Sequence, residues 1–151
     1  MKRTLLVTGG AGFIGANFIQ RWLREHPGDR IVNLDALTYA GNRSTLVDLE
    51  GREDYRFVHG DIRDAELLRR LFEEEPFNTV VHFAAESHVD RSILGPAAFV
   101  ETNVRGTFAL LEATRCAWDE RPEGARFLHV STDEVYGTLG PEDAPWTEVA
   151  L

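Results

Sequence analysis

The sequence contains very little cysteine or lysine and has no long apolar run. Cys116 is the only cysteine among the 151 residues, so no internal disulfide can form, which favours a reducing compartment and hence the cytoplasm. No apolar stretch is long enough to span a membrane. The chain opens Met-Lys-Arg and then turns apolar, but this run ends at Val7 and glycines follow at once. We therefore interpret it as part of the fold and not as a targeting segment.

Acidic residues outnumber basic ones, 25 to 16, and the positive charge is nearly all arginine. The formal net charge of −9 argues against a general binder of nucleic acid or anionic membranes, because neither surface would attract this chain. The five histidines lack metal-ligand spacing, so we predict no metal site. His59, His82 and His129 fall in predicted strands, which favours hydrogen-bonded core histidines. A hydrophobic content of 43% suits one globular domain of this length.

A glycine-rich turn joins an apolar strand to an apolar-faced helix near the start of the chain. Residues 4–7 read as a short buried strand, and Ile14, Phe18 and Trp22 then recur at helical spacing. The first N–H groups of such a helix are unpaired and its dipole is positive at that end, so the turn can bind a phosphate. Two motif frames fit: G-x-G-x-x-G from Gly10, Gly12 and Gly15, and G-x-x-G-x-x-G from Gly9, Gly12 and Gly15.

An acidic residue follows at the distance expected for a dinucleotide site. Asp35 lies twenty residues after Gly15, at the end of a second apolar run over residues 31–34. A carboxylate there accepts hydrogen bonds from an adenosine ribose. The alternative is an ordinary tight turn with a surface aspartate. Ala36, not arginine, comes next, so a 2′-phosphate would meet no adjacent cation and NAD is favoured over NADP; Arg43 is the nearest later phosphate partner.

The order of predicted elements indicates an α/β fold. Near-continuous apolar strands alternate with helices, which is typical of a parallel sheet covered on both faces. Right-handed crossovers then predict a Rossmann-like, doubly wound sheet of strand order 3-2-1-4-5. The predicted strands are residues 4–7, 31–34, 55–59, 79–83 and 126–130. The predicted helices follow the glycine turn, cover residues 44–49 with Ser44 as cap, run from a cap at Asp64 to Pro76, and cover residues 96–118.

The last of these helices is the longest. We expect its inward face to consist mostly of its large apolar residues. Gly106 lies within it, where glycine costs about 1 kcal/mol relative to alanine, and close packing against the sheet is the simplest explanation. The residues expected to point inward are Phe99, Val100, Val104, Phe108, Leu111 and Ala113.

Polar residues follow every predicted strand, at the sheet edge where such folds bind ligands. Asp61 and Ile62 come after the third strand; this carboxylate could accept from an adenine amino group while the isoleucine packs on the ring, or it could be a turn aspartate. Thr132, Asp133 and Glu134 come after the fifth strand. Adjacent carboxylates repel each other, which separates acid and base roles, although such a pair is also common in solvated loops.

Several stretches resemble a known family. T-G-G-A-G-F-I-G, residues 8–15, is similar to the extended short-chain dehydrogenase/reductases. The more specific stretches resemble the dTDP-glucose 4,6-dehydratases within that family, and the likeness runs from Lys2 to about Gly137. These stretches are L-T-Y-A-G-N at 37–42, A-A-E-S-H-V-D-R-S at 84–92, G-P-A-A-F-V-E-T-N-V at 95–104 and S-T-D-E-V-Y-G at 131–137.

The resemblance implies NAD as cofactor and assigns residues to each part of it. Backbone at the glycine turn contacts the pyrophosphate, residues after the second strand surround the adenosine ribose, and Asp61 with Ile62 holds the adenine. Residues after the fourth strand line the nicotinamide side, and Thr102 also contacts the cofactor. The implied cofactor residues are Gly9, Gly12, Phe13, Ile14, Gly15, Asp35, Ala36, Leu37, Thr38, Asp61, Ile62, Phe83, Ala84, Ala85, Glu86, Ser87 and Thr102.

The resemblance also implies a reaction. Such enzymes oxidise the glucose C4 hydroxyl of dTDP-glucose with NAD, eliminate water across C5–C6 and return the hydride to C6, giving a 4-keto-6-deoxy sugar nucleotide. Ser87 and Thr132 would touch the sugar. Asp133 would be the general acid that protonates the departing C6 hydroxyl, and Glu134 the base that removes the C5 proton.

The chain departs from the family in one essential respect. The family uses a Tyr-x-x-x-Lys pair to take the C4 hydroxyl proton, yet Lys2 is the only lysine, and Tyr39, Tyr55 and Tyr136 are followed four residues later by other residue types. We therefore expect residues 1–151 to be an incomplete NAD-binding Rossmann domain, the amino-terminal part of a dehydratase without its sugar-nucleotide domain.

Such a chain would bind NAD weakly and would not turn over substrate alone. Other interpretations remain open: a related nucleotide-sugar epimerase or decarboxylase, or a non-catalytic dinucleotide-binding module. The helix over residues 96–118 could also support a homodimer, as in the family.

Overall fold

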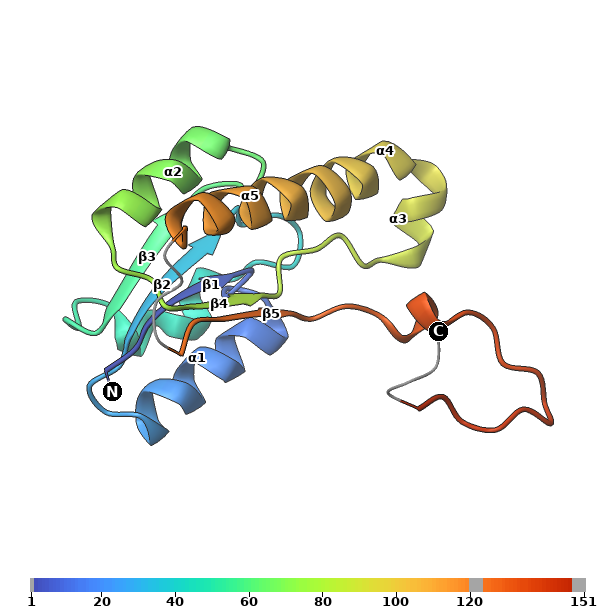
Figure 1. The fold of residues 1–151 in the computed structure, drawn as a ribbon, viewed down its shortest axis with the longest axis horizontal. Helices are drawn as coiled ribbons and strands as arrows, with labels where there is room; N and C mark the ends of the chain where they lie inside the picture. Colours follow the sequence, from blue (N-terminus) through green and yellow to red (C-terminus); the bar gives the residue numbers. More distant parts are fainter. Residues whose placement is uncertain (1, 120–123, 148–151) are drawn as a thin grey trace.

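The computed structural model describes residues 2–119 and 124–147, and its centre is one parallel sheet (Figure 1). The order β3-β2-β1-β4-β5 confirms the predicted topology. In register, Leu6 of β1 lies opposite Val32 of β2 and Val80 of β4. The five strands are β1 (Thr4–Thr8), β2 (Arg30–Asp35), β3 (Tyr55–His59), β4 (Thr79–His82) and β5 (Arg126–His129).

Helices cover both faces of the sheet. Because side chains alternate along a strand, Leu5 and Val7 pack with α1 and η1 on one face, whereas Leu6 packs with α2 and α5 on the other. The helical segments are α1 (Phe13–Glu25), the 3₁₀ helix η1 (Arg43–Leu49), α2 (Ala65–Glu74), α3 (Val89–Leu94), α4 (Pro96–Phe99), the π-helical turn η2 (Val100–Gly106), α5 (Thr107–Ala117) and the 3₁₀ turn η3 (Asp133–Tyr136).

Most predicted helix positions are confirmed, with differences at their ends. Asp64 caps α2, its side chain accepting from the Leu67 amide at 2.9 Å. The cap of η1 is Asn42 and not Ser44, because the Asn42 side chain accepts from the Ser44 amide at 3.1 Å. The short helix α3 was not predicted, since it has no buried residue and therefore no apolar periodicity facing a core.

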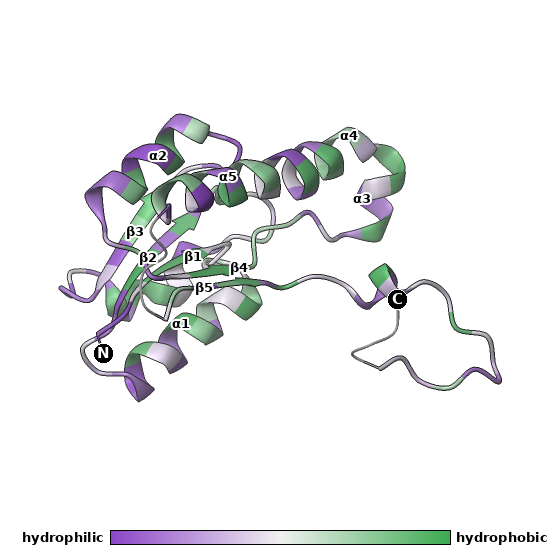
Figure 2. Cartoon of the chain, in the orientation of Figure 1, coloured by the Kyte–Doolittle hydropathy of each residue, from purple (hydrophilic) through white to green (hydrophobic). Residues whose placement is uncertain are grey.

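The predicted long helix is present as α4, η2 and α5 in continuous succession, with one π-helical turn in its middle. The predicted inward face is wrong for four residues: Val100, Val104, Phe108 and Leu111 are exposed by 45–63%, whereas the buried positions are Gly106, Leu110 and Thr114. Gly106 and Thr114 lie on the covered side beside Leu110, although they are small or polar, so apolar character alone pointed to the wrong stripe. Figure 2 shows hydrophobic residues along this helix.

Gly106 packs closely, but not against a strand. An added Cβ would lie 2.7 Å from two side-chain carbons of Ile62, which follows β3. Within the described residues, no helix is long and apolar enough to cross a membrane.

Candidate functional site

The glycine turn brings three backbone segments into contact. Gly9 has φ +70°, and an added Cβ would lie 2.6 Å from the Ala84 nitrogen. A Cβ on Gly15 would overlap the Gly9 carbonyl oxygen, and one on Gly10 would overlap the Asn33 side chain. Gly12 is less crowded, with the Gly9 oxygen at 3.3 Å. Glycine is thus required because the end of β1, the start of α1 and the chain after β4 touch through their backbones.

Helix α1 begins directly at this turn. Its N-cap, Gly12, has extended backbone geometry, and no side chain caps the helix or adds an acidic group to its first turn. The first-turn amides are therefore free of side-chain partners and the dipole is uncompensated, which is the arrangement that binds a phosphate. Phe13 and Ile14 are exposed by 85% and 61%, at the mouth of the turn.

Asp35 is buried at the end of β2 and is held by two backbone amides. One carboxylate oxygen accepts from the Ala11 nitrogen and the other from the Leu37 nitrogen, both at 2.8 Å. Leu37 has φ +51°, a left-handed geometry that turns the chain back so that its amide reaches the carboxylate. An ionised carboxylate has about four lone-pair positions, so Asp35 retains acceptor capacity for ligand hydroxyls.

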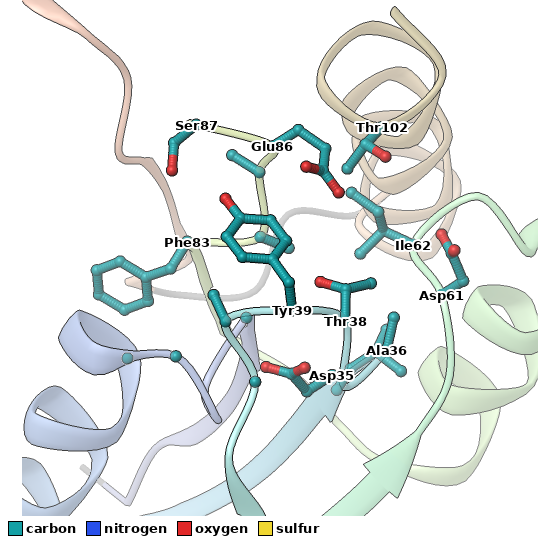
Figure 3. Close-up of a pocket in the computed structure, with 18 of the residues that line it drawn as sticks. Asp35, Ala36, Thr38, Tyr39, Asp61, Ile62, Phe83, Glu86, Ser87 and Thr102 are labelled. Carbon is teal, nitrogen blue, oxygen red and sulfur yellow. The ribbon is translucent and has the colours of Figure 1, made fainter. Parts of the chain in front are cut away.

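These groups open into one pocket of about 420 Å³ (Figure 3). Every cofactor residue implied by the resemblance lines it except Leu37, whose role in the structure is to donate to Asp35. The structure adds lining residues that the sequence did not single out: Leu34, Tyr39, Ala40, Gly41, Gly60, Arg63, Ala98 and Val130.

Asp61 is both a lining residue and a turn aspartate. Its carboxylate pairs with the Arg63 guanidinium at 2.6 Å and accepts from the Arg63 amide at 2.8 Å, and the first of these contacts lowers the pKa of Asp61. Ile62 beside it is buried and packs against Gly106. Asp61 is thus a turn residue whose position also lines the pocket.

The run after β4, residues 83–87, is clamped to the π-helical turn. The Asn103 side chain bonds the Glu86 backbone twice, accepting from its nitrogen and donating to its oxygen, both at 2.8 Å. Thr102 beside it lines the pocket, so η2 both holds this run and contributes to the wall (Figure 3). One Glu86 carboxylate oxygen is buried with no hydrogen-bond partner among the described residues; an Arg91 guanidinium nitrogen lies 3.9 Å from it.

Tyr39 forms part of the outer wall. Its ring lies over the pocket in Figure 3, and the Arg91 guanidinium stacks on it 4.3 Å from the ring centre. Arg91 comes from α3, the helix that periodicity missed. The only sequence signal for Tyr39 was its place in the L-T-Y-A-G-N stretch.

Of the three strand histidines, only His82 is confirmed as a core residue; His59 and His129 are exposed. Its Nδ1 lies 2.6 Å from the Thr8 hydroxyl and its Nε2 lies 2.9 Å from the Thr107 hydroxyl. Burial, assisted by the nearby His129 ring, lowers the pKa of His82 to about 4.

This lowered pKa predicts a specific pH dependence of stability. In the unfolded chain His82 takes up a proton near pH 6.5, but in the folded chain only near pH 4. The free energy of unfolding is therefore unaffected by the titration of His82 above pH 6.5, and it decreases as the pH falls from 6.5 to 4. The loss amounts to about 3 kcal/mol. Urea titrations at pH 7 and 4.5 should show a clearly smaller pH effect in His82→Asn than in wild type. His88→Asn, at an exposed site, should match wild type; equal pH effects in all three proteins would refute the assignment.

The structure does not bring Thr132, Asp133 and Glu134 to this pocket. All three are exposed, and none lines it, although Val130 just before them does. The Thr132 hydroxyl accepts from the Glu134 amide at 3.3 Å and so begins η3. Figure 1 shows this segment running away from the body of the molecule after β5. Ser87, the other predicted sugar contact, does line the pocket.

A parallel sheet of this order, with a side-chain-free turn into α1 and a buried aspartate after β2, is the arrangement of the Rossmann-type fold that is typical of dinucleotide-binding proteins. The chain belongs to the family described as GDP-mannose 4,6 dehydratase, whose model matches residues 6–150.

Several relatives of this chain are dTDP-glucose 4,6-dehydratases. The protein of that name from Xanthomonas campestris pv. campestris (strain B100) is 60% identical over 149 residues, which is 96% of this chain and 42% of the relative. The one from Mycobacterium tuberculosis (strain H37Rv) is 54% identical over 145 residues, or 95% of this chain and 41% of the relative. The chain thus spans less than half the length of these curated relatives.

Solved structures agree in fold. DesIV, a dTDP-glucose 4,6-dehydratase from Streptomyces venezuelae crystallised with NAD, superposes with a TM-score of 0.83 and 50% identity, covering 98% of this chain and 44% of that one. A UDP-glucose 4-epimerase from Thermus thermophilus, in complex with NAD, superposes with a TM-score of 0.77 and 32% identity, covering 97% and 43%. Dehydratases and epimerases therefore share this scaffold, and the dehydratase is the more similar in sequence.

Proposed function

We propose that this chain is the NAD-binding part of a dTDP-glucose 4,6-dehydratase. The observation that carries the proposal is the common pocket into which the glycine turn, Asp35, Ile62 and the run 83–87 all open. The 60% identity to a dehydratase supports the substrate class, since the epimerase that superposes well is only 32% identical.

The pocket residues suit NAD in chemistry and position. The free amides at the start of α1 would hold the pyrophosphate, Asp35 would accept from the adenosine ribose hydroxyls, and Ile62 would pack on the adenine. A 2′-phosphate would face the Asp35 carboxylate with Ala36 beside it, so NADP should bind less well. When bound, NAD would supply the group that accepts the hydride from C4 and later donates it to C6.

The sugar chemistry is assigned to groups after β4 and β5. We propose that Ser87 and Thr132 bind the sugar, that Glu134 removes the proton from C5 and that Asp133 gives a proton to the departing C6 oxygen. Support comes from the sheet: β5 neighbours β4, and Ser87 and Val130, which follow these strands, both line the pocket.

We expect this chain to bind NAD without turning over dTDP-glucose. We expect isothermal titration calorimetry to detect NAD binding, with NADP at least about tenfold weaker because of the unneutralised 2′-phosphate. We expect no 4-keto product from dTDP-glucose and NAD, because no tyrosine is followed by lysine at the fourth position.

Three outcomes would contradict parts of this proposal. Absence of NAD binding to the folded chain would contradict the dinucleotide site. Detectable 4-keto sugar would contradict the requirement for the missing Tyr-x-x-x-Lys pair. NAD binding combined with no response to dTDP-glucose in any longer form of the protein would favour the non-catalytic module.

We also propose that the chain forms a homodimer through the exposed stripe on the long helix. Val100, Val104, Phe108 and Leu111 form an uncovered apolar stripe, which monomers seldom expose. Sedimentation velocity should give a dimer that Phe108→Arg converts to monomer. Val47→Arg, at another exposed apolar site, should leave the dimer intact. Identical sedimentation of all three as monomers would reject this interface.

We further propose that the protein works in the cytoplasm. Cys116 is the only cysteine, and a chain without an internal disulfide suits a reducing compartment.

A further inference from the structure

His82 lies outside the set of residues so far assigned to the cofactor, yet it is the most deeply buried ionisable group near the pocket, with 1% of its surface exposed. It ends β4, immediately before the lining run 83–87. Its two ring nitrogens reach hydroxyls on two different elements, Thr8 at the end of β1 and Thr107 at the start of α5.

The His82 ring bonds a hydroxyl on each side. Its Nδ1 lies 2.6 Å from the Thr8 hydroxyl, whose oxygen also accepts from the Ala84 amide at 3.4 Å. Its Nε2 lies 2.9 Å from the Thr107 hydroxyl. A hydroxyl can donate or accept, so a neutral imidazole, with one donor and one acceptor nitrogen, satisfies both contacts.

This network sets the separation of two walls of the pocket. Gly9 follows Thr8, and its Cα faces the Ala84 backbone so closely that no Cβ fits between them. The same run is held at its far end by Asn103, which lies four residues before Thr107 on the helix. The run 83–87 is thus fastened to one helix at two points, and the first of them depends on His82.

We propose that His82 is a positioning residue for dinucleotide binding, which holds the end of β1 and the run 83–87 at the spacing that the cofactor needs. It touches no ligand itself and acts through Thr8, Ala84 and Thr107. The test of this proposal by NAD affinity rests on the proposed NAD site, whereas its test by amide hydrogen exchange does not.

The test compares two substitutions of His82 with a matched buried change elsewhere. His82→Leu removes both hydrogen bonds, whereas His82→Asn keeps a hydrogen-bonding amide near the position of Nδ1 and so preserves the contact with Thr8. Thr114→Val removes a buried hydroxyl from α5, where Thr114 donates to the Leu110 carbonyl, without contacting the pocket.

We expect His82→Leu to weaken NAD binding about tenfold by calorimetry, at a temperature where every variant is folded, and His82→Asn to recover most of that loss. Thr114→Val should lower the melting temperature while leaving the NAD affinity within about twofold of wild type. The proposal fails if His82→Leu binds NAD like wild type, or if Thr114→Val weakens binding as much as His82→Leu does.

Amide hydrogen exchange without NAD gives an independent readout. Exchange at Ala84 and Glu86 should be about tenfold faster in His82→Leu and near wild type in His82→Asn and Thr114→Val. If the wild-type chain binds no NAD, the proposed function fails while this exchange pattern still decides the role of His82. Unchanged exchange in His82→Leu would overturn the positioning role even if NAD binds.

Discussion

Gly9→Ala is expected to abolish measurable NAD binding. The residue has φ +70°, a geometry that costs an L-residue about 1–2 kcal/mol. The larger effect is steric, because the added Cβ would lie 2.6 Å from the Ala84 nitrogen and 2.8 Å from the Phe83 carbonyl carbon. Both atoms are backbone, so relief requires β1 and the run 83–87 to separate. We expect at least a 100-fold loss of affinity by calorimetry.

Gly51→Ala is the matched control for this substitution. Gly51 has a similar φ of +79°, but nothing lies within 4 Å of an added Cβ. It therefore carries the backbone strain without the collision and should destabilise the chain slightly while leaving NAD affinity near wild type. If Gly51→Ala impairs binding as much as Gly9→Ala, strain and not close approach explains the result, and the steric account is wrong.

Asp35→Ala is expected to reduce NAD affinity about 100-fold or more. The substitution removes the acceptor for the ribose hydroxyls, and hydrogen bonds to a charged group contribute about 1.5–3 kcal/mol each. It also leaves the Ala11 and Leu37 amides without their partner, so the glycine turn and the loop after β2 lose their common anchor. Calorimetry with NAD and NADP measures both effects, and the preference between the two cofactors should shrink.

Two further variants serve as controls for the NAD affinity of Asp35→Ala. Asp35→Asn keeps one acceptor oxygen and should bind NAD better than the alanine variant. Asp54→Ala removes a carboxylate paired with Arg52 in an exposed ion pair away from the pocket and should bind like wild type. NAD affinity unchanged in Asp35→Ala would show that the ribose lies elsewhere.

Features set by neighbouring residues were predictable from the sequence. The glycine turn needs only backbone shape, and its strand, glycines and helix are contiguous in the chain. Asp35 was found because it ends an apolar strand at a fixed distance from the turn. Strand order followed from alternating strands and helices with right-handed crossovers, which is a general property of parallel sheets.

Features that depend on which side of an element is covered were not predictable. On the long helix the buried positions include Gly106, which packs against Ile62, and Thr114, and which side of a helix is covered is a tertiary property. The apolar residues Val104 and Phe108 form a second stripe that hydrophobicity alone cannot distinguish from the first. Asn42 replaced Ser44 as a cap because both residue types can cap and only geometry decides.

The acid and base candidates show the same limit. Asp133 and Glu134 were expected at the pocket because polar residues after parallel strands converge. The structure confirms this convergence for Asp35, Asp61 and Ser87, each of which lines the pocket. Thr132, Asp133 and Glu134, which follow the edge strand β5, are exposed and do not line the pocket, so their catalytic placement stays a prediction.

The central claim is that the side-chain-free turn between β1 and α1 seats the dinucleotide pyrophosphate. A titration of the ¹⁵N-labelled chain with NAD, followed by amide NMR shifts, tests it most directly. The account predicts saturable shifts that are largest at Gly9, Phe13 and Ile14, with further shifts at Leu37 and Ala84. Saturable shifts that spare this turn and centre on another part of the molecule would contradict it.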